Sequence, residues 1–205
     1  MEYNIKIIKV DKFKLSNWSG GTTTEMFIYP ENSKYTEKNF KWRISSATID
    51  SDVSNFTNLP GISRELMVIQ GSTTLEHANH YSVDLKPFDK DSFKGEWTTK
   101  SYGSVVDFNL MTTDGCIGKI NCLVIESRKQ FKLSFKVNNN QYKKQMKYYY
   151  SPQQDFLMVA NNQNYLVNKK ELVCITKSEK SDLSEVYILN STSEDKKIIE
   201  TIVYY

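Results

Sequence analysis

The amino-acid sequence predicts an all-β fold, on three observations. Aromatic residues make up 13% of the 205-residue chain, with 13 tyrosines and 10 phenylalanines, and these residue types favour strands. Short apolar runs recur along the chain, separated by turn signals such as Asp114 followed by Gly115. No stretch carries the sustained period of an amphipathic helix. Many short strands at such spacing are typical of a sandwich or a barrel, and the length allows one large β-domain or two small ones.

The predicted strands share alternating or continuous apolar residues bounded by polar turns. They span residues 3–10, 25–29, 41–49, 65–69, 72–76, 81–85, 104–111, 119–126, 130–137, 144–150, 155–159, 171–176, 185–189 and 197–203. The polar tract at 137–144 predicts a hairpin loop. The tyrosines at 148–150 predict a strand with rings on both faces, and a stacking platform for nucleic-acid bases is the alternative.

Charge is nearly balanced, because 27 basic and 24 acidic residues give a net charge of +3. A protein that binds nucleic acid or an anionic membrane through bulk charge usually carries a clear basic excess, so we expect neither partner. Lys143, Lys144 and Lys147 fall close together, and we interpret them as part of a solvated face.

Localisation and redox state follow from the apolar runs and the cysteines. No run approaches the ~18 apolar residues of a membrane span, and the N-terminal stretch lacks the apolar region of a signal peptide. We therefore expect a cytoplasmic protein. Cys116, Cys122 and Cys174 form no Cys-x-x-Cys pair, and their odd number fits reduced thiols better than a disulfide framework.

The segment WSGGTTTEMFIYP, which begins at Trp18, has the character of a site. Gly20 and Gly21 allow backbone conformations closed to other residues and let a partner approach closely. Thr23 supplies a donor and an acceptor, and Glu25 supplies a charge. The alternative is an ordinary glycine turn that leads into a strand.

Two later segments place polar side chains together on one face of a strand. In FKWRISSATI, alternation puts Arg43 and Ser45 on the same face. In VVDFNLMT, Asp107, Asn109 and Met111 share a face, so that a carboxylate and an amide lie side by side.

With a further segment, LPGISRELMVIQG, these stretches resemble the HutD/Ves family in order and spacing. The family carries a tryptophan, a glycine-rich turn and Thr-x-Glu, followed by WRxSxA, PGxxRxLxxxxG and DFNxM. The matching residues are Trp18, Gly20, Gly21, Thr23 and Glu25; Trp42, Arg43, Ser45 and Ala47; Pro60, Gly61, Arg64, Leu66 and Gly71; and Asp107, Phe108, Asn109 and Met111. The resemblance covers roughly residues 14–115, and the chain departs from the family pattern at Ser19, Thr22 and Val106.

The resemblance implies a bicupin, with two cupin-like β-barrels or sandwiches in one chain and little helix. We place the N-terminal barrel, which carries the motifs, at residues 1–115 and the C-terminal barrel at 116–205, with strand exchange between them allowed. The turn-rich stretch TTDGCIG marks the seam. Barrels of this class commonly pair through their sheets, which favours a homodimer.

Metal binding is not indicated. Metal-dependent cupins hold their ion with three histidines and a glutamate, whereas this chain has His77 and His80 alone. Their spacing places them on opposite faces of a strand, and we expect both to be exposed loop histidines. A site of two histidines with carboxylates is the alternative.

Catalytic motifs are also missing from the sequence. It contains no GxSxG elbow, no Walker A loop and no Rossmann fingerprint, so neither a serine hydrolase nor a nucleotide cofactor is indicated, and we expect no cofactor. Glu25 and Asp107 are weak candidates for general acid or base catalysis, because both fall in motif segments.

Arg43 and Arg64 are the stronger candidates for a binding function. A guanidinium offers donors in a fixed fork that suits carboxylates. Hydroxyl groups of Thr23, Ser45 and Ser46 would complete a site for a small anionic metabolite. The alternative is that either arginine pairs with Glu25 or Asp107 in a structural network.

The remaining candidates complete this ligand site. Asn109 would recognise a formyl, amide or carboxyl oxygen, and Trp18 or Met111 would form an apolar wall. The resemblance implies a ligand connected with histidine utilisation, such as formylglutamate or urocanate, and a regulatory or sensing role without a metal. Two other functions stay open: a metal-independent isomerase or hydrolase acting on a small acid, and a protein-interaction module.

Overall fold

The computed structural model describes residues 3–135, 142, 144–177 and 185–205. Within these residues, regular structure is β-strand apart from two short 3₁₀ turns, η1 (Val10–Lys12) and η2 (Tyr35–Glu37). The prediction of an all-β protein with little helix is confirmed. Most of the predicted hairpin loop at 137–144 lies outside the described residues.

The chain divides into two compact units. The N-terminal unit is Lys12–Ile120, and the C-terminal unit combines Met1–Asp11 with Asn121–Tyr205. The sequence-based division between residues 115 and 116 falls in the turn between β11 (Val105–Thr113) and β12 (Ile117–Ile125), and it stays a prediction.

Two antiparallel sheets form the N-terminal unit. The N-terminal major sheet has the strand order β2-β3-β4-β11-β6-β9, and the N-terminal minor sheet has the order β5-β10-β7-β8. Besides β11, their strands are β2 (Lys14–Trp18), β3 (Gly21–Tyr29), β4 (Trp42–Ile49), β5 (Val53–Asn55), β6 (Ile62–Gly71), β7 (Thr73–His77), β8 (Tyr81–Leu85), β9 (Lys90–Lys94) and β10 (Thr99–Tyr102).

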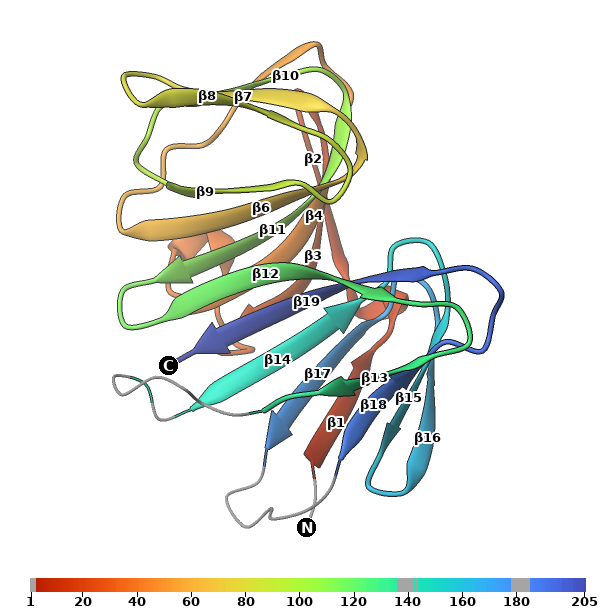
Figure 1. The fold of residues 1–205 in the computed structure, drawn as a ribbon. Coiled ribbons are helices and arrows are strands. Elements are labelled where there is room, and N and C mark those ends of the chain that lie inside the picture. Colours follow the sequence, from red (N-terminus) through yellow and green to blue (C-terminus); the bar gives the residue numbers. More distant parts are fainter. Residues whose placement is uncertain (1–2, 136–141, 143, 178–184) are drawn as a thin grey trace. The chain divides into compact units, whose positions relative to one another are not determined.

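Two further sheets contain the strands of the C-terminal unit. The C-terminal major sheet has the order β1-β17-β14-β19-β12, and the C-terminal minor sheet has the order β13-β18-β15-β16. Besides β12, their strands are β1 (Tyr3–Ile8), β13 (Gln130–Leu133), β14 (Gln145–Tyr150), β15 (Phe156–Ala160), β16 (Gln163–Val167), β17 (Leu172–Lys177), β18 (Val186–Leu189) and β19 (Lys196–Tyr204). Figure 1 shows the N-terminal strand β1 beside β17.

The strand order of the first unit is repeated in the second. Within the major sheets, the order β4-β11-β6-β9 corresponds to β12-β19-β14-β17. Within the minor sheets, β5-β10-β7-β8 corresponds to β13-β18-β15-β16. Each strand label from β4 to β11 is thus matched by the label eight higher, although the sequence shows no internal repeat.

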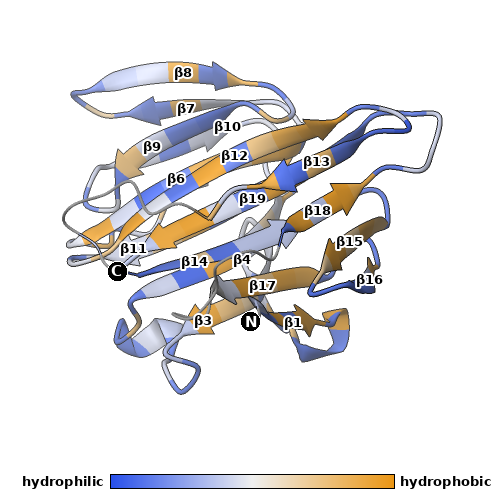
Figure 2. Cartoon of the chain, turned by 60° about the horizontal axis from the view of Figure 1, so that its bottom comes forward, coloured by the Kyte–Doolittle hydropathy of each residue, from blue (hydrophilic) through white to orange (hydrophobic). Residues whose placement is uncertain are grey.

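Each unit has its own apolar core. The N-terminal core joins both sheets of its unit, since Leu66 and Val68 of the major sheet cluster with Leu75 and Leu85 of the minor sheet. In the C-terminal core, Val173 and Ile175 of β17 cluster with residues of β15 and β18. Figure 2 shows β17 as hydrophobic along most of its length. Burial of these residues is the main force that holds the sheets together.

Every strand predicted from the sequence corresponds to an observed strand, with ends that differ by a few residues. The prediction omits β2, β5, β9, β10 and β16, all of which are short. The first glycine turn lies between β2 and β3, so the strand after it begins earlier than expected, at Gly21.

Tyr148, Tyr149 and Tyr150 lie on strand β14, as predicted, and their burial excludes the alternative of a stacking platform for bases. Two expectations about exposure are wrong. Lys147 is buried, so it does not belong to a solvated face, and Lys143 lies outside the described residues. His77 lies at the end of β7 and is 1% exposed, not in an exposed loop.

Among the described segments, no helix has the length and apolar character needed to cross a membrane.

Candidate functional site

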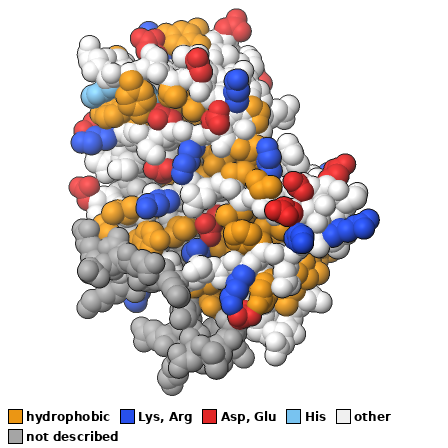
Figure 3. Space-filling view, in the orientation of Figure 1, with side chains coloured by type: hydrophobic (Ala, Val, Ile, Leu, Met, Phe, Trp, Pro, Cys, Tyr) orange, Lys and Arg blue, Asp and Glu red, His pale blue; other side chains and the backbone are white. Residues whose placement is uncertain are grey.

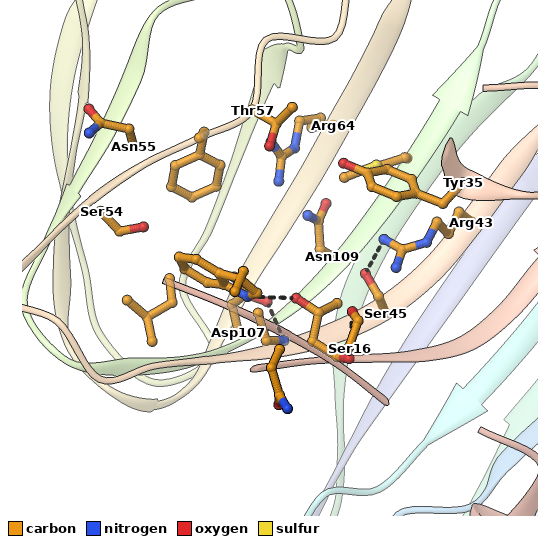
Figure 4. A pocket seen from close by; sticks show the side chains of 17 residues that line it. Ser16, Tyr35, Arg43, Ser45, Ser54, Asn55, Thr57, Arg64, Asp107 and Asn109 are labelled. Carbon is orange, nitrogen blue, oxygen red and sulfur yellow. Dashed lines mark hydrogen bonds between the residues drawn. The ribbon is translucent and has the colours of Figure 1, made fainter. Parts of the chain in front are cut away.

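A cavity of about 250 Å³ lies within the N-terminal unit, and most of its polar lining comes from the major sheet. Figure 4 shows the side chains around it. The lining residues are Ser16, Asn17, Trp18, Thr23, Tyr35, Arg43, Ser45, Ala47, Ile49, Ser54, Asn55, Phe56, Thr57, Arg64, Asp107, Asn109 and Met111.

Strand alternation brings the central residues of the cavity together. On β4, Arg43 and Ser45 face the cavity, and on β11, Asp107, Asn109 and Met111 do so. Both predicted faces are confirmed. Because β11 lies between β4 and β6, side chains from these strands converge on one space.

Arg43 is held by partners within the protein. Its Nε donates to Oε2 of Glu25 at 2.7 Å, and its Nη1 donates to Oγ of Ser45 at 3.1 Å. The guanidinium carbon also lies 4.4 Å from the ring centre of Tyr35. Nζ of Lys14 lies 3.8 Å from the other carboxylate oxygen of Glu25. Glu25 therefore neutralises Arg43 and does not line the cavity.

Arg64 has a different environment. Its side chain is 6% exposed, and within the described part of the chain it makes no hydrogen bond or ion pair; its Nε is buried without a partner. The guanidinium carbon lies 4.6 Å from the ring centre of Phe56 and 5.2 Å from that of Phe93. Burial lowers the pKa of Arg64 to about 10, so the group remains a cation at neutral pH.

Asp107 is a buried carboxyl group that faces the same space. Its Oδ1 accepts a hydrogen bond from the backbone N–H of Ala47 at 3.0 Å. Burial raises the pKa of Asp107 to about 6, although that hydrogen bond and the positive charges of Arg64 and Arg43 oppose the rise. Neither arginine lies within ion-pair distance of Asp107 in the described structure. The carboxyl group thus titrates close to neutral pH.

Asn109 adds an amide to this arrangement. It is 5% exposed, and its Oδ1 is buried without a hydrogen-bond partner in the described structure. Figure 4 shows the side chains of Arg64 and Asn109 pointing into the cavity. A buried polar atom left without a partner costs folding free energy, and Arg64 and Asn109 bring two such atoms to one cavity.

Trp18 and Thr23 form part of the cavity wall. The indole Nε1–H of Trp18, which is 38% exposed, donates to Oγ1 of Thr23 at 3.1 Å. Both residues belong to the β2–β3 hairpin, which the glycine turn closes. The hairpin therefore brings an aromatic ring and a hydroxyl group to the cavity.

Four predicted site residues do not line the cavity: Gly20, Gly21, Glu25 and Ser46. A Cβ atom on Gly21 would lie 1.9 Å from the carbonyl oxygen of Thr48, so this glycine allows close strand pairing. Ser46 donates to the backbone carbonyl of Asp107 at 2.6 Å and supports β11 instead.

Several lining residues are not among the predicted site residues, and Tyr35 and Phe56 matter most among them. Their rings lie against the guanidinium groups of Arg43 and Arg64. Tyr35 belongs to a 3₁₀ turn and Phe56 follows β5, so no strand periodicity marks either of them. The sequence signal that marks both residues is an aromatic side chain in a segment between two strands.

His77 is part of a hydrogen-bonded network away from the cavity. Its Nδ1 lies 2.8 Å from Oγ1 of Thr99, and its Nε2 lies 2.8 Å from Oδ2 of Asp91. His80 stacks on Trp97, with ring centres 3.8 Å apart. Among the described residues, no group of three or more histidine, cysteine or acidic side chains is placed to hold a metal ion.

Acidic and basic side chains are interspersed on the face drawn in Figure 3. Of the two arginines at the cavity, Arg43 is paired with Glu25, and Arg64 makes no ion pair in the described structure.

The fold is that of an all-β, cupin-like protein. Oxalate decarboxylase OxdC from Bacillus subtilis has a similar structure, with a TM-score of 0.67 and 7% sequence identity over 95% of this chain and 76% of that one. At this identity the similarity concerns the fold alone.

The chain belongs to the HutD family, whose model matches residues 11–186. HutD from Pseudomonas fluorescens SBW25 is 16% identical, with a TM-score of 0.68 over 98% of this chain and 100% of that one. A conserved protein of unknown function from Pseudomonas aeruginosa PAO1 is 15% identical, with a TM-score of 0.79 over 98% of both chains.

Proposed function

We propose that this protein binds a small carboxylate metabolite, similar to formylglutamate or urocanate, in the cavity of the N-terminal unit. The binding would serve a regulatory or sensing role in histidine utilisation. Membership of the HutD family supports the link to that process. The observation that carries the proposal is Arg64, a buried cation at the cavity that makes no hydrogen bond or ion pair with any described residue, Asp107 included.

Arg64 would bind the carboxylate group. A buried charge without a partner is costly, and a ligand carboxylate offsets that cost when it accepts hydrogen bonds from the guanidinium. The rings of Phe56 and Phe93 hold the guanidinium in place. No metal ion is needed, because the arginine itself supplies the positive charge.

Asn109 would select the rest of the ligand. Its unpartnered Oδ1 requires a donor, and formylglutamate and urocanate each carry an N–H group as well as a carboxylate. Arg43 would shape the wall and add positive potential, since Glu25 and Ser45 already engage its fork. We further propose that each unit is a cupin-like barrel, so that the chain is a bicupin.

Isothermal titration with formylglutamate, urocanate and formate would test the proposal, with Arg64→Met as the main variant. HutD from P. fluorescens was solved in a formate condition, and formate is the simplest carboxylate probe. We expect the variant to lose affinity for the best ligand by roughly 10- to 100-fold, the value of a charged hydrogen bond.

A matched control is Arg128→Met, which removes the chain's remaining arginine from an exposed turn. This variant should bind as the unchanged protein does. Without ligand, Arg64→Met should melt at the same or a higher temperature, because it replaces a buried, unpaired cation with an apolar side chain. Equal carboxylate binding by both variants would overturn the proposal.

A second candidate function is metal-independent catalysis on the bound acid, with Asp107 as the general base. The specific observation is that the pKa of this cavity carboxyl is raised to about 6, which suits proton transfer near neutral pH. Incubation of formylglutamate or urocanate with the protein, followed by proton NMR, would detect turnover. Product formed by the unchanged protein and not by Asp107→Asn would support catalysis with Asp107 as the base. Absence of product with the unchanged protein would exclude this function for the two acids.

A further inference from the structure

The repeated strand order gives the position of Arg64 a counterpart in the C-terminal unit. On β6, Arg64 lies opposite Met111 of β11. On the corresponding strand β14, Lys147 lies opposite Ile202 of β19. Both major sheets therefore carry a cation at a comparable place in the register.

The aromatic surroundings of the two cations also correspond. The guanidinium of Arg64 lies over Phe56, which follows β5, and Nζ of Lys147 lies 5.4 Å from the ring centre of Phe135, which follows β13. The strands β5 and β13 occupy the same position in the two minor sheets. Each cation is thus buried against a phenylalanine from the equivalent loop.

The two positions differ in what neutralises the charge. Two residues before Met111 on β11 stands Asn109, and two residues before Ile202 on β19 stands Glu200. Oε1 of Glu200 lies 2.8 Å from Nζ of Lys147. Lys147 and Glu200 are 5% and 8% exposed, so the pair is formed in the interior of the unit.

Two further donors complete the environment of the Glu200 carboxylate. The hydroxyl of Tyr149 donates to its Oε1 at 3.0 Å, and Nδ2 of Asn121 donates to its Oε2 at 3.2 Å. Burial, followed by the charge of Glu200 and the hydrogen bond to it, raises the pKa of Tyr149 well above its usual value, so the phenol remains a donor. An ammonium, a phenol and an amide form a donor set that suits any small carboxylate.

We infer that the C-terminal unit contains a second carboxylate-binding site, equivalent in the fold to the Arg64 cavity, which the side chain of Glu200 occupies from within. The inference rests on the proposed function only for the parallel with Arg64; the donors around Glu200 stand independently. Shortening Glu200 opens the site to a free monocarboxylate such as formate or acetate.

Chemical rescue tests this inference in the full chain. Every variant carries Arg64→Met, so that any carboxylate effect arises outside the proposed N-terminal site. Added to this background, Glu200→Ala leaves Lys147 buried without its carboxylate, and the melting temperature should fall. Sodium formate or acetate should then raise it by about 4 °C or more beyond sodium chloride at equal ionic strength.

The matched control adds Lys147→Met to Glu200→Ala, which removes the cation together with its carboxylate. We expect this variant to show no difference between formate and chloride. If Glu200→Ala does not fold in chloride, refolding in formate should recover the folded fraction, and the same salt should not help the control. Equal behaviour in formate and chloride, or equal rescue with and without Lys147, would overturn the inference.

The outcome is distinguishable from that of the proposed function. Rescue at Lys147 can occur even when the protein with an intact Arg64 binds no metabolite, in which case only the proposed function fails. Conversely, metabolite binding that depends on Arg64 can occur without rescue at Lys147, in which case only the inference fails.

Discussion

Arg43 and Arg64 line the same cavity, yet they have opposite electrostatic environments. Arg43 forms an ion pair with Glu25, whereas Arg64 lies against two phenylalanine rings and makes no ion pair with a described carboxylate. Arginine has rigid donors and is weakly hydrated, so it tolerates burial against aromatic rings better than lysine does. The unpaired arginine is the one that leaves its donors available to a ligand.

Asp107 makes the stability of the protein depend on pH. The pKa of its carboxyl is raised from 3.8 to about 6, so the folded protein holds this proton more tightly than the unfolded chain. Between these two values the contribution of Asp107 to the unfolding free energy falls as pH rises. The cost of the buried charge is fully present above pH 6 and is relieved as pH falls.

Asp107→Asn should remove this dependence. From the size of the pKa shift, we expect the unfolding free energy of the unchanged protein, relative to the variant, to fall by on the order of 3 kcal/mol between pH 4 and pH 7. Urea denaturation at several pH values measures the difference. Asp114→Asn, in an exposed turn, is the control and should leave the slope unchanged. Parallel curves for Asp107→Asn and the unchanged protein would contradict this account of Asp107.

At the scale of elements, the sequence predicts strands rich in buried apolar residues and misses short strands that bury one apolar residue or none. Strand β2 has the sequence KLSNW and is exposed at every residue, and β9 has the sequence KDSFK, with Phe93 alone buried. Both are edge strands, which pair on one side and often carry charged residues. Neither residue pattern distinguishes such a strand from a loop.

The candidate site was predictable to the extent that it depends on strand alternation. Arg43, Ser45, Asp107 and Asn109 reach the cavity because their positions on β4 and β11 share a face. The pairing of Arg43 with Glu25 was not decidable, because Asp107 was an equally good partner on chemical grounds. Register between strands, which the sequence does not encode locally, determines the choice.

Asn161 holds the beginning of strand β1, in addition to the pairing of this strand with β17. Its Oδ1 accepts from the backbone N–H of Tyr3 at 3.0 Å, and its Nδ2 donates to the carbonyl of Tyr3 at 2.8 Å. The amide side chain thus satisfies both backbone groups of Tyr3 at the beginning of the strand. Asn161 and Asn162 both adopt positive φ, as is common for asparagine in turns.

Asn161→Gly should loosen β1 without straining the turn, because glycine accepts the positive φ. Loss of two hydrogen bonds, each worth about 1 kcal/mol, should speed amide exchange in β1 by roughly 10-fold or more. Asn162→Gly changes the neighbouring turn residue, for which no side-chain contact to β1 is seen in the described structure, and should leave the rates unchanged. Amide hydrogen exchange measured by mass spectrometry compares both variants with the unchanged protein. Equal exchange rates in β1 for all three proteins would show that Asn161 does not hold this strand.

At the scale of the whole molecule, one strand order supports two different interiors. In the N-terminal unit the cation on β6 faces a cavity, and in the C-terminal unit the cation on β14 is neutralised by Glu200. The difference depends on a few side chains and not on topology. For this reason, strand prediction alone could not indicate which half contains the cavity.

The separation of the two interiors predicts where a ligand acts. A metabolite bound at Arg64 should slow amide exchange in β4, β6 and β11, the strands that contribute to the cavity. Exchange in β14 and β19 should not change, because Lys147 and Tyr149 are already paired with Glu200. Comparison of free and formylglutamate-bound protein by exchange mass spectrometry tests this. Protection spread equally over both units would argue against a site confined to the N-terminal unit.

Strand β1 also imposes an order on synthesis. Ile5 pairs with Ile175, so the N-terminal unit lies between these partners in the chain. At about 5–20 residues per second, roughly 10 to 30 s separate their translation. Strand β1 therefore stays without its partner β17 while the ribosome synthesises the N-terminal unit. A nascent chain that stops before β17 cannot complete the C-terminal unit.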